Sequence, residues 1–294
     1  MVGKTDNLEG GPVQKISIYE VGPRDGLQTI KKVVPTRMKR ALIQALRGAG
    51  LRSIETVSFA HPLYVPQMAD AEKVFDGQGA ALVMNQRGMD RALKSGVTHF
   101  NIVFSPSEEF NRRNLGCELK EALARYMVML EGVPKANVRV YLSCFFGCPY
   151  EGDMPMAKRV KAIQAAKLFG DTVVLSDTVG TGTRHEVEVG AGICDKIGIK
   201  AALHLHHRAD REEQALSLVR RGIECGITEF DASIAGLGGC PFVEGSPGNL
   251  ATGSLVRYLG FLGHDCGVSI DDLANAKRIA LSIAEPFSPP TLSA

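Results

Sequence analysis

Short apolar runs alternate with amphipathic stretches along almost the whole chain. Each apolar run has the length of one buried strand. These runs lie at 16–20, 53–57, 80–84, 100–104, 138–143, 172–176, 201–206 and 227–232. The stretches between them carry apolar residues at helical spacing, around 36–50, 67–74, 118–132, 157–168, 185–197 and 211–225. Two further helical patterns, near 252–263 and 271–284, follow the last predicted strand.

Eight strands that alternate with helices predict a (β/α)8 TIM barrel, here with additional C-terminal helices. A doubly wound open sheet is the alternative, but it requires a glycine-rich phosphate turn after its first strand. Residues 21–28 form a charged turn instead, and no low-complexity linker divides the chain. We therefore expect one barrel domain over 15–294, preceded by a flexible N-terminal segment at 1–14.

The composition excludes several classes of function. A net charge of +2 with a pI near 8.1 gives no reason to expect nucleic acid or a membrane surface as a partner. The chain has neither a signal-peptide pattern nor an apolar stretch of membrane-spanning length. Its 7 cysteines are an odd number, which is typical of buried, reduced thiols. We expect a cytoplasmic protein.

Reactive residues recur where the predicted strands end. In a barrel, the carboxyl ends of the strands and the loops after them surround one shared site. The residues concerned are Glu20, Arg24, Asp25 and Gln28 after the first strand, Glu55 and Ser58 in the second, Arg139, Tyr141 and Ser143 in the fifth, His204 and His206 in the seventh, and Cys240 and Asn249 after the eighth. This concentration predicts an enzyme.

Two histidines in the seventh strand predict a metal site. Residues two apart on a strand point to the same face, so His204 and His206 can bind one ion, while His207 points away from them. Asp25 offers a carboxylate oxygen and Asn249 an amide oxygen. Such a set of nitrogen and oxygen ligands, with open positions, suits Mg²⁺ or Mn²⁺ as a Lewis acid, with Zn²⁺ as a further candidate.

Three other groups have catalytic and structural interpretations that the sequence leaves open. Arg24 either forms a surface ion pair with Asp25 or stabilises a developing oxyanion. Glu55, like Glu20, either orients Arg24 or takes a direct part in catalysis. Cys240, in a glycine-rich run, is either a buried apolar residue or an exposed thiol on a mobile loop that transfers a proton or attacks as a nucleophile.

Seven segments carry a resemblance to a known family. Read in one-letter code, they are EVGPRDGLQ (20–28), IETVSF (54–59), VPQMAD (65–70), SCFFGCPYEG (143–152), DTVG (177–180), AGLGGCP (235–241) and GNLAT (248–252). Together they resemble the hydroxymethylglutaryl-CoA lyases, the metal-dependent lyase branch of a barrel superfamily of Claisen and retro-Claisen enzymes with a pyruvate-carboxyltransferase-like domain. The likeness extends from about residue 15 to 285.

The resemblance implies a retro-Claisen cleavage of 3-hydroxy-3-methylglutaryl-CoA, or a close analogue, to acetyl-CoA and a ketoacid such as acetoacetate. It implies that Asp25, His204, His206 and Asn249 hold the divalent cation. We assign catalysis to Arg24, Cys240 and Glu55, and contact with the acyl-CoA substrate to Arg24, Gln28, Ser58 and Arg139. By analogy with the family we also expect a homodimer.

Three departures from the family pattern affect the predicted substrate. His61 and Leu63 replace a usual Ser and Lys, Val174 stands where a substrate-binding serine is common, and about three extra residues separate His206 from Gln214. A lyase for a hydroxyacyl-CoA with a different 3-substituent is therefore an alternative. A Claisen-condensing synthase of the isopropylmalate type is another, although such synthases carry an extra C-terminal domain. A barrel without activity that serves in binding is the third.

Overall fold

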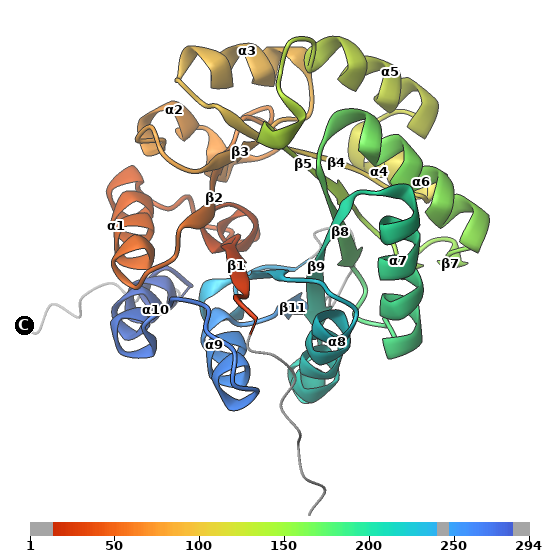
Figure 1. Ribbon diagram of the computed structural model, residues 1–294. Helices are drawn as coiled ribbons and strands as arrows, with labels where there is room; N and C mark the ends of the chain where they lie inside the picture. Colours follow the sequence, from red (N-terminus) through yellow and green to blue (C-terminus); the bar gives the residue numbers. More distant parts are fainter. Residues whose placement is uncertain (1–13, 240–246, 285–294) are drawn as a thin grey trace, which may run out of the picture.

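The strands close into a barrel that a ring of helices surrounds (Figure 1). The computed structural model describes residues 14–239 and 247–284. Within these ranges, parallel pairing runs from strand to strand, and β10 pairs with both β9 and β1, which closes the sheet. The barrel strands are β1 (Ser17–Glu20), β2 (Ser53–Ser58), β3 (Ala80–Leu82), β4 (His99–Phe104), β5 (Val138–Leu142), β8 (Thr172–Asp177), β9 (Lys200–His207) and β10 (Glu229–Ala232). Each coincides with one of the predicted apolar runs, so the predicted TIM barrel is confirmed.

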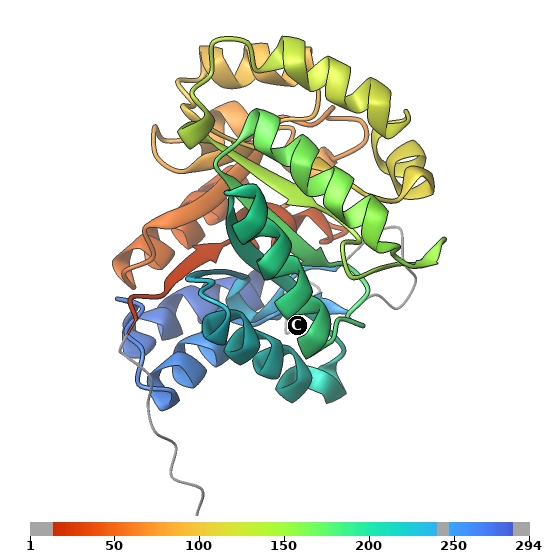
Figure 2. The same cartoon turned by 45° about the vertical axis from the view of Figure 1, so that its right-hand side comes forward.

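The helices lie along the outside of the barrel (Figure 2). They are α1 (Thr36–Gly48), α2 (Ala71–Val74), α3 (Gln86–Lys94), α4 (Glu108–Leu115), α5 (Leu119–Met129), α6 (Met156–Phe169), α7 (Arg184–Ile197), α8 (Glu212–Glu224), α9 (Thr252–Phe261) and α10 (Ile270–Ala284). The sequence did not indicate α3 and α4, because both are short and mostly polar. Arg112 and Arg113 lie in α4, where both form exposed ion pairs with Glu109.

The two C-terminal helices complete the ring. In Figure 1, α9 and α10 lie between α8 and α1. The chain before α10 is fixed to the end of α1, since the amide of Ser269 donates to the carbonyl of Ala49 at 2.8 Å. Gly50 follows with a φ of +100°, and a Cβ there would meet the carbonyl oxygen of Gly267. The predicted C-terminal helices are thus present, and they seal the ring between its last and first members.

Alternation along the strands separates two layers of side chains. On β8, Val173 and Leu175 belong to the main core between strands and helices, whereas Val174 packs inside the barrel with Tyr141 and Ala202. Because side chains alternate with a period of two, Ser176 also faces the barrel interior. His204 and His206 share the inward face of β9 with Ala202 for the same reason.

Two small pairings lie beyond the barrel strands. β6 (Gly147–Cys148) and β7 (Gly152–Asp153) form a hairpin after β5, and β11 (Gly248–Asn249) runs antiparallel to the end of β9. The six described cysteines, Cys117, Cys144, Cys148, Cys194, Cys225 and Cys266, are reduced thiols and not half-cystines, as the sequence led us to expect. Cys240 and the N-terminal segment 1–13 lie outside the described residues. Over the described ranges, no helix is both long enough and apolar enough to cross a membrane.

Candidate metal centre and active site

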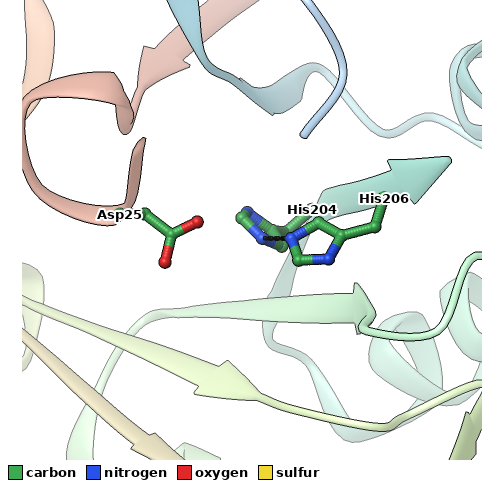
Figure 3. A group of neighbouring side chains, drawn as sticks. All are labelled: Asp25, His204 and His206. Carbon is green, nitrogen blue, oxygen red and sulfur yellow. Dashed lines mark hydrogen bonds between the residues drawn. The ribbon is translucent and has the colours of Figure 1, made fainter. Parts of the chain in front are cut away.

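Asp25, His204 and His206 form a cluster at the carboxyl end of the barrel. One potential ligand atom from each lies within 4.8 Å of the other two. Figure 3 shows both imidazoles on β9 and Asp25 on the turn that follows β1. The Nε2 atoms of His204 and His206 are 3.0 Å apart, so the two rings converge on one point. The spacing of two in the sequence therefore places both histidines on one inward face, as predicted.

The donor set fits a divalent cation. Burial, followed by the proximity of His204, lowers the pKa of His206 to about 4, so this imidazole is neutral with a lone pair available. Burial alone would raise the pKa of the Asp25 carboxyl, but Arg24 and the two histidines outweigh it, and the net shift is downward. A carboxylate beside two converging imidazole nitrogens is a ligand set for Mg²⁺, Mn²⁺ or Zn²⁺. We conclude that these residues form a candidate metal site.

A tight helical turn presents Arg24 and Asp25 to the cluster. The turn spans Gly22–Gly26, and the carbonyl of Val21 accepts the amides of both residues, at 3.1 and 2.7 Å. A Cβ at Gly22 would lie 2.5 Å from Oε1 of Glu20, so only glycine fits there. The charged turn that the sequence indicated after the first strand is thus a short π-helical turn.

Asn249 reaches the cluster from the other side. It lies on β11 opposite His206, because the two strands pair antiparallel at this point. Its Nδ2 donates to Oδ2 of Asp25 at 2.7 Å and to the carbonyl of Leu237 at 2.9 Å. The geometry brings all four predicted metal ligands together.

Arg24 is held in a buried network with two carboxylates. Its Nε donates to Oε2 of Glu55 at 2.5 Å, and its Nη1 donates to Oδ1 of Asp25 at 2.9 Å. Burial alone would lower the pKa of Arg24, but the negative charges of Glu55 and Asp25 raise it by more. The net shift is upward, so the guanidinium is charged. Glu55 lies inside β2 and not at its end, and the side-chain amide of Asn101 on β4 donates to its second oxygen at 2.7 Å. Arg24 is therefore not a surface ion pair.

Glu20 connects the loops and does not pair with Arg24. Its Oε1 accepts from the amides of Gly22 and Ile234, each at 2.8 Å, and its Oε2 accepts from the hydroxyl of Thr252 at 2.6 Å. Full burial raises the pKa of this carboxyl, and the three hydrogen bonds lower it. The net pKa is about 7, above the usual value for Glu. Glu20 thus joins the turn after β1 to the loop after β10, which bound the site from two sides.

We expect Glu20→Gln to change how stability depends on pH. A carboxyl with a raised pKa in the folded state contributes stability below its unfolded pKa, and this contribution is lost as the pH rises toward 7. The amide oxygen can keep the two bonds from the amides of Gly22 and Ile234, and the amide NH2 can donate to the Thr252 oxygen, all without a charge. Relative to the native chain, the variant should therefore gain about 2 kcal/mol in the free energy of unfolding between pH 5 and pH 8. Urea titrations of both chains across this range measure the difference, and a difference independent of pH would contradict it.

Asp231 is a residue of the site that sequence reasoning missed. It lies on the inward face of β10, where its Oδ2 is 3.1 Å from Nδ1 of His204 and accepts from the hydroxyl of Tyr141 at 2.8 Å. Its Oδ1 accepts from Arg139 at 2.5 Å. Bonding at Nδ1 leaves Nε2 of His204 directed at the cluster. An acidic residue inside an apolar strand was the signal in the sequence.

Replacing Asp231 by asparagine should weaken metal binding. The substitution removes the anionic partner that orients the His204 ring and raises its basicity. Loss of such a partner lowers metal affinity by about 10- to 100-fold. A calorimetric titration with Mn²⁺ measures this change in affinity. Unaltered Mn²⁺ affinity in a folded variant would show that Asp231 serves only to neutralise Arg139.

The other predicted substrate contacts are more scattered. Ser58 ends β2, buried, with its hydroxyl accepting from the amide of Ala60 at 3.1 Å. Gln28 is half-buried just after the turn that carries Arg24. Arg139 does not lie at the carboxyl end of β5, because it is the second residue of that strand, and it forms ion pairs with Glu229 and Asp231. Arg139 therefore lies below the cluster, where its guanidinium forms an ion pair with the Asp231 carboxylate.

Together the barrel and its site define a class of protein: a (β/α)8 enzyme with a candidate two-histidine, one-aspartate metal centre at the carboxyl end of its strands. Comparison with known proteins is more specific. The HMGL-like family model matches residues 15–280. The mitochondrial hydroxymethylglutaryl-CoA lyase of Gallus gallus is 38% identical over 272 residues, which cover 88% of this chain and 90% of that one. The chain belongs to the hydroxymethylglutaryl-CoA lyase-like family.

Two further relatives agree with this assignment. A Pseudomonas aeruginosa protein named 3-hydroxy-3-isohexenylglutaryl-CoA/hydroxymethylglutaryl-CoA lyase is 38% identical over 277 residues, covering 90% of this chain and 91% of that one. The crystal structure of the HMG-CoA lyase from Brucella melitensis superposes with a TM-score of 0.85 at 32% identity, over 92% of this chain and 99% of that one. The likeness therefore spans the whole barrel.

Proposed function

We propose that the protein cleaves 3-hydroxy-3-methylglutaryl-CoA, or a close 3-hydroxyacyl-CoA analogue, into acetyl-CoA and a ketoacid such as acetoacetate. The observation that carries this proposal is the convergence of Asp25, His204 and His206 beside the buried Arg24–Glu55 pair. A carbon–carbon lyase of this kind needs an acidified hydroxyl and a cation facing the new enolate. The metal cluster can meet the first requirement, and Arg24 can meet the second.

Asp25, His204, His206 and Asn249 would hold the cation, Mg²⁺ or Mn²⁺ with Zn²⁺ as a further candidate, which when bound supplies Lewis acidity that lowers the pKa of the substrate hydroxyl. In the cleavage, the hydroxyl proton passes to water and the bond between C2 and C3 breaks, and one proton is later returned to C2, so that protons balance over the reaction. The bonding electrons pass to the thioester, which becomes an enolate, and C3 becomes the ketone carbon.

Arg24 stabilises the enolate oxygen in this proposal. Two of its N–H groups are used by Glu55 and Asp25, and the guanidinium has further N–H groups to donate. Because Glu55 and Asn101 fix the guanidinium before substrate arrives, its orientation costs little at the moment of reaction. Cys240 is proposed to take part in the proton transfer that converts the enolate into acetyl-CoA. Gln28 and Ser58 remain proposed substrate contacts.

The test is acetyl-CoA release from 3-hydroxy-3-methylglutaryl-CoA, with Mg²⁺ or Mn²⁺ against EDTA. Metal-dependent release that is lost in Cys240→Ala supports both the reaction and the role of the thiol. Absence of release from a protein that still binds Mn²⁺ would rule out this substrate. A panel of other 3-hydroxyacyl-CoA thioesters then decides whether another 3-substituent is accepted.

A second candidate is a lyase for an acyl-CoA with a larger apolar 3-substituent. The wall of the barrel beside His204 is apolar, since Val103, Tyr141, Val174 and Ala202 pack together there. The ring of Tyr141 lies edge-on to that of His204, with centroids 5.9 Å apart. A ratio of kcat/KM values above one for a longer-chain 3-hydroxyglutaryl-CoA over the methyl compound would favour this candidate.

We also propose that the protein is a homodimer and acts in the cytoplasm. The described cysteines are reduced and form no disulfide with one another, which agrees with a reducing compartment. Light scattering coupled to size-exclusion chromatography determines the number of copies.

A further inference from the structure

The hydroxyl of Ser176 is buried inside the barrel, and no hydrogen bond that stabilises the fold uses it. Ser176 lies near the end of β8 in register with His204, and its residue is 3% exposed. Its Oγ has no hydrogen-bond partner among the described residues. A buried hydroxyl without a partner costs free energy, and such groups in native proteins call for a specific explanation.

The direction of this side chain follows from the alternation along β8. Val174, two residues earlier, packs against Tyr141 and Ala202 inside the barrel. Asp177, the next residue, points to the outer side, where its carboxylate accepts the amides of Thr181 and Gly182 at 3.0 and 2.8 Å. The end of β8 is thus well bonded on its outer side, and the unpartnered group is the one that faces the cluster.

The order of the strands places Ser176 across the barrel from Arg24 and Glu55. Going round the sheet, β8 is four strands away from β2 and adjacent to β9. His204 and His206 of the metal cluster lie on β9, beside Ser176. A glutaryl-type thioester whose carbonyl faces Arg24 and whose hydroxyl lies at the cluster must direct its other end toward β8. In the substrates proposed above, that end is a carboxylate.

We propose that the Ser176 hydroxyl donates a hydrogen bond to the carboxylate of the substrate's acyl chain and so selects thioesters of dicarboxylic acids. This assignment rests on the proposed function and adds a specificity-determining residue to it. In the neighbouring cluster of Val103, Tyr141, Val174 and Ala202, the only side-chain donor is the Tyr141 hydroxyl, which already donates to Asp231 at 2.8 Å. A hydrogen bond to an ionised acceptor is stronger than one between neutral groups, so its loss should be measurable.

The experiment compares two uncleavable thioesters in the Mn²⁺-saturated protein. Glutaryl-CoA has the carboxylate and lacks the 3-hydroxyl, whereas butyryl-CoA lacks both. Calorimetric dissociation constants are measured for the native chain and for Ser176→Ala. We expect the variant to bind glutaryl-CoA about tenfold more weakly and butyryl-CoA as tightly as before. Unchanged butyryl-CoA binding also shows that the variant is folded.

Ser105→Ala is the matched control. Ser105 is equally buried after β4, but its hydroxyl already donates to the carbonyl of Ser143 at 2.7 Å. This variant should keep the native preference for glutaryl-CoA over butyryl-CoA. Equal weakening of both thioesters by Ser176→Ala, or no weakening of either, would overturn the assignment of Ser176 and leave the proposed function intact. If the native protein binds neither thioester, the proposed function fails as well.

Discussion

Replacing His206 by alanine is expected to abolish divalent-cation binding and carbon–carbon cleavage together. His206 supplies one of the two nitrogens that converge in the cluster, and its Nε2 lies 3.0 Å from that of His204. A bound Lewis acid contributes several kcal/mol to stabilising the charge that develops on oxygen. Loss of the ion should therefore lower kcat/KM for the acyl-CoA by about a thousandfold or more. Mn²⁺ titration and acetyl-CoA release measure the two effects in one preparation.

The neighbouring histidine provides the control for this variant. His207 follows directly in the sequence, but it is half-buried and its Nδ1 contacts the carbonyl of Arg208 at 2.9 Å, outside the cluster. His207→Ala should retain both Mn²⁺ binding and cleavage. If His206→Ala instead binds Mn²⁺ with native affinity, the cluster is not the metal centre. If both variants lose activity while Mn²⁺ binding persists, the two histidines position the substrate and do not bind the cation.

The barrel was predictable because its strands are buried on both faces. Parallel strands covered by helices appear in the sequence as short continuous apolar runs, and these are easy to recognise. The helices were less predictable. For example, α3 buries Met89 and Ala92 but is otherwise strongly polar, so its helical period is weak in the sequence. Its position is determined by packing on the barrel and by Asn85, whose side chain accepts the amide of Gly88 at its start.

The sequence predicted which face a site residue occupies better than how deep it lies. His204 and His206 are neighbours along one strand, so a period of two sufficed to pair them. The sequence also placed Arg139 and Ser143 on one face of the fifth strand, but a separation of four residues corresponds to about 13 Å along a strand, and Ser143 follows the end of β5. Arg139 consequently lies below the site. Asp231 and Asn101 were missed because their roles depend on which strands are adjacent across the barrel, which the closed order of the sheet determines.

Variants of the Arg24–Glu55 pair should separate the contribution of Arg24 to stability from its contribution to catalysis. In Arg24→Ala, Glu55 keeps its buried position without the cation that faces it, and breaking a buried pair in this way costs about 3–5 kcal/mol. Burial raises the pKa of Glu55, and removing Arg24 removes the main opposing influence. The free energy of unfolding of the variant should therefore fall most above neutral pH, where the unpaired carboxylate must be ionised.

Adding Glu55→Gln to Arg24→Ala should restore much of the stability and none of the activity. The amide no longer carries a buried charge, and it can still accept from Asn101, so the structural cost is largely removed. The enolate would remain without its cation, and loss of one such donor lowers kcat by about 10²- to 10³-fold. Arg24→Lys gives the complementary case, because it keeps the charge but lacks the planar fork that bonds Glu55 and Asp25 together. Near-native stability with a similar loss of kcat in the lysine variant would place the contribution of Arg24 in its geometry. Recovery of cleavage in the double variant would instead show that Arg24 serves only to neutralise Glu55.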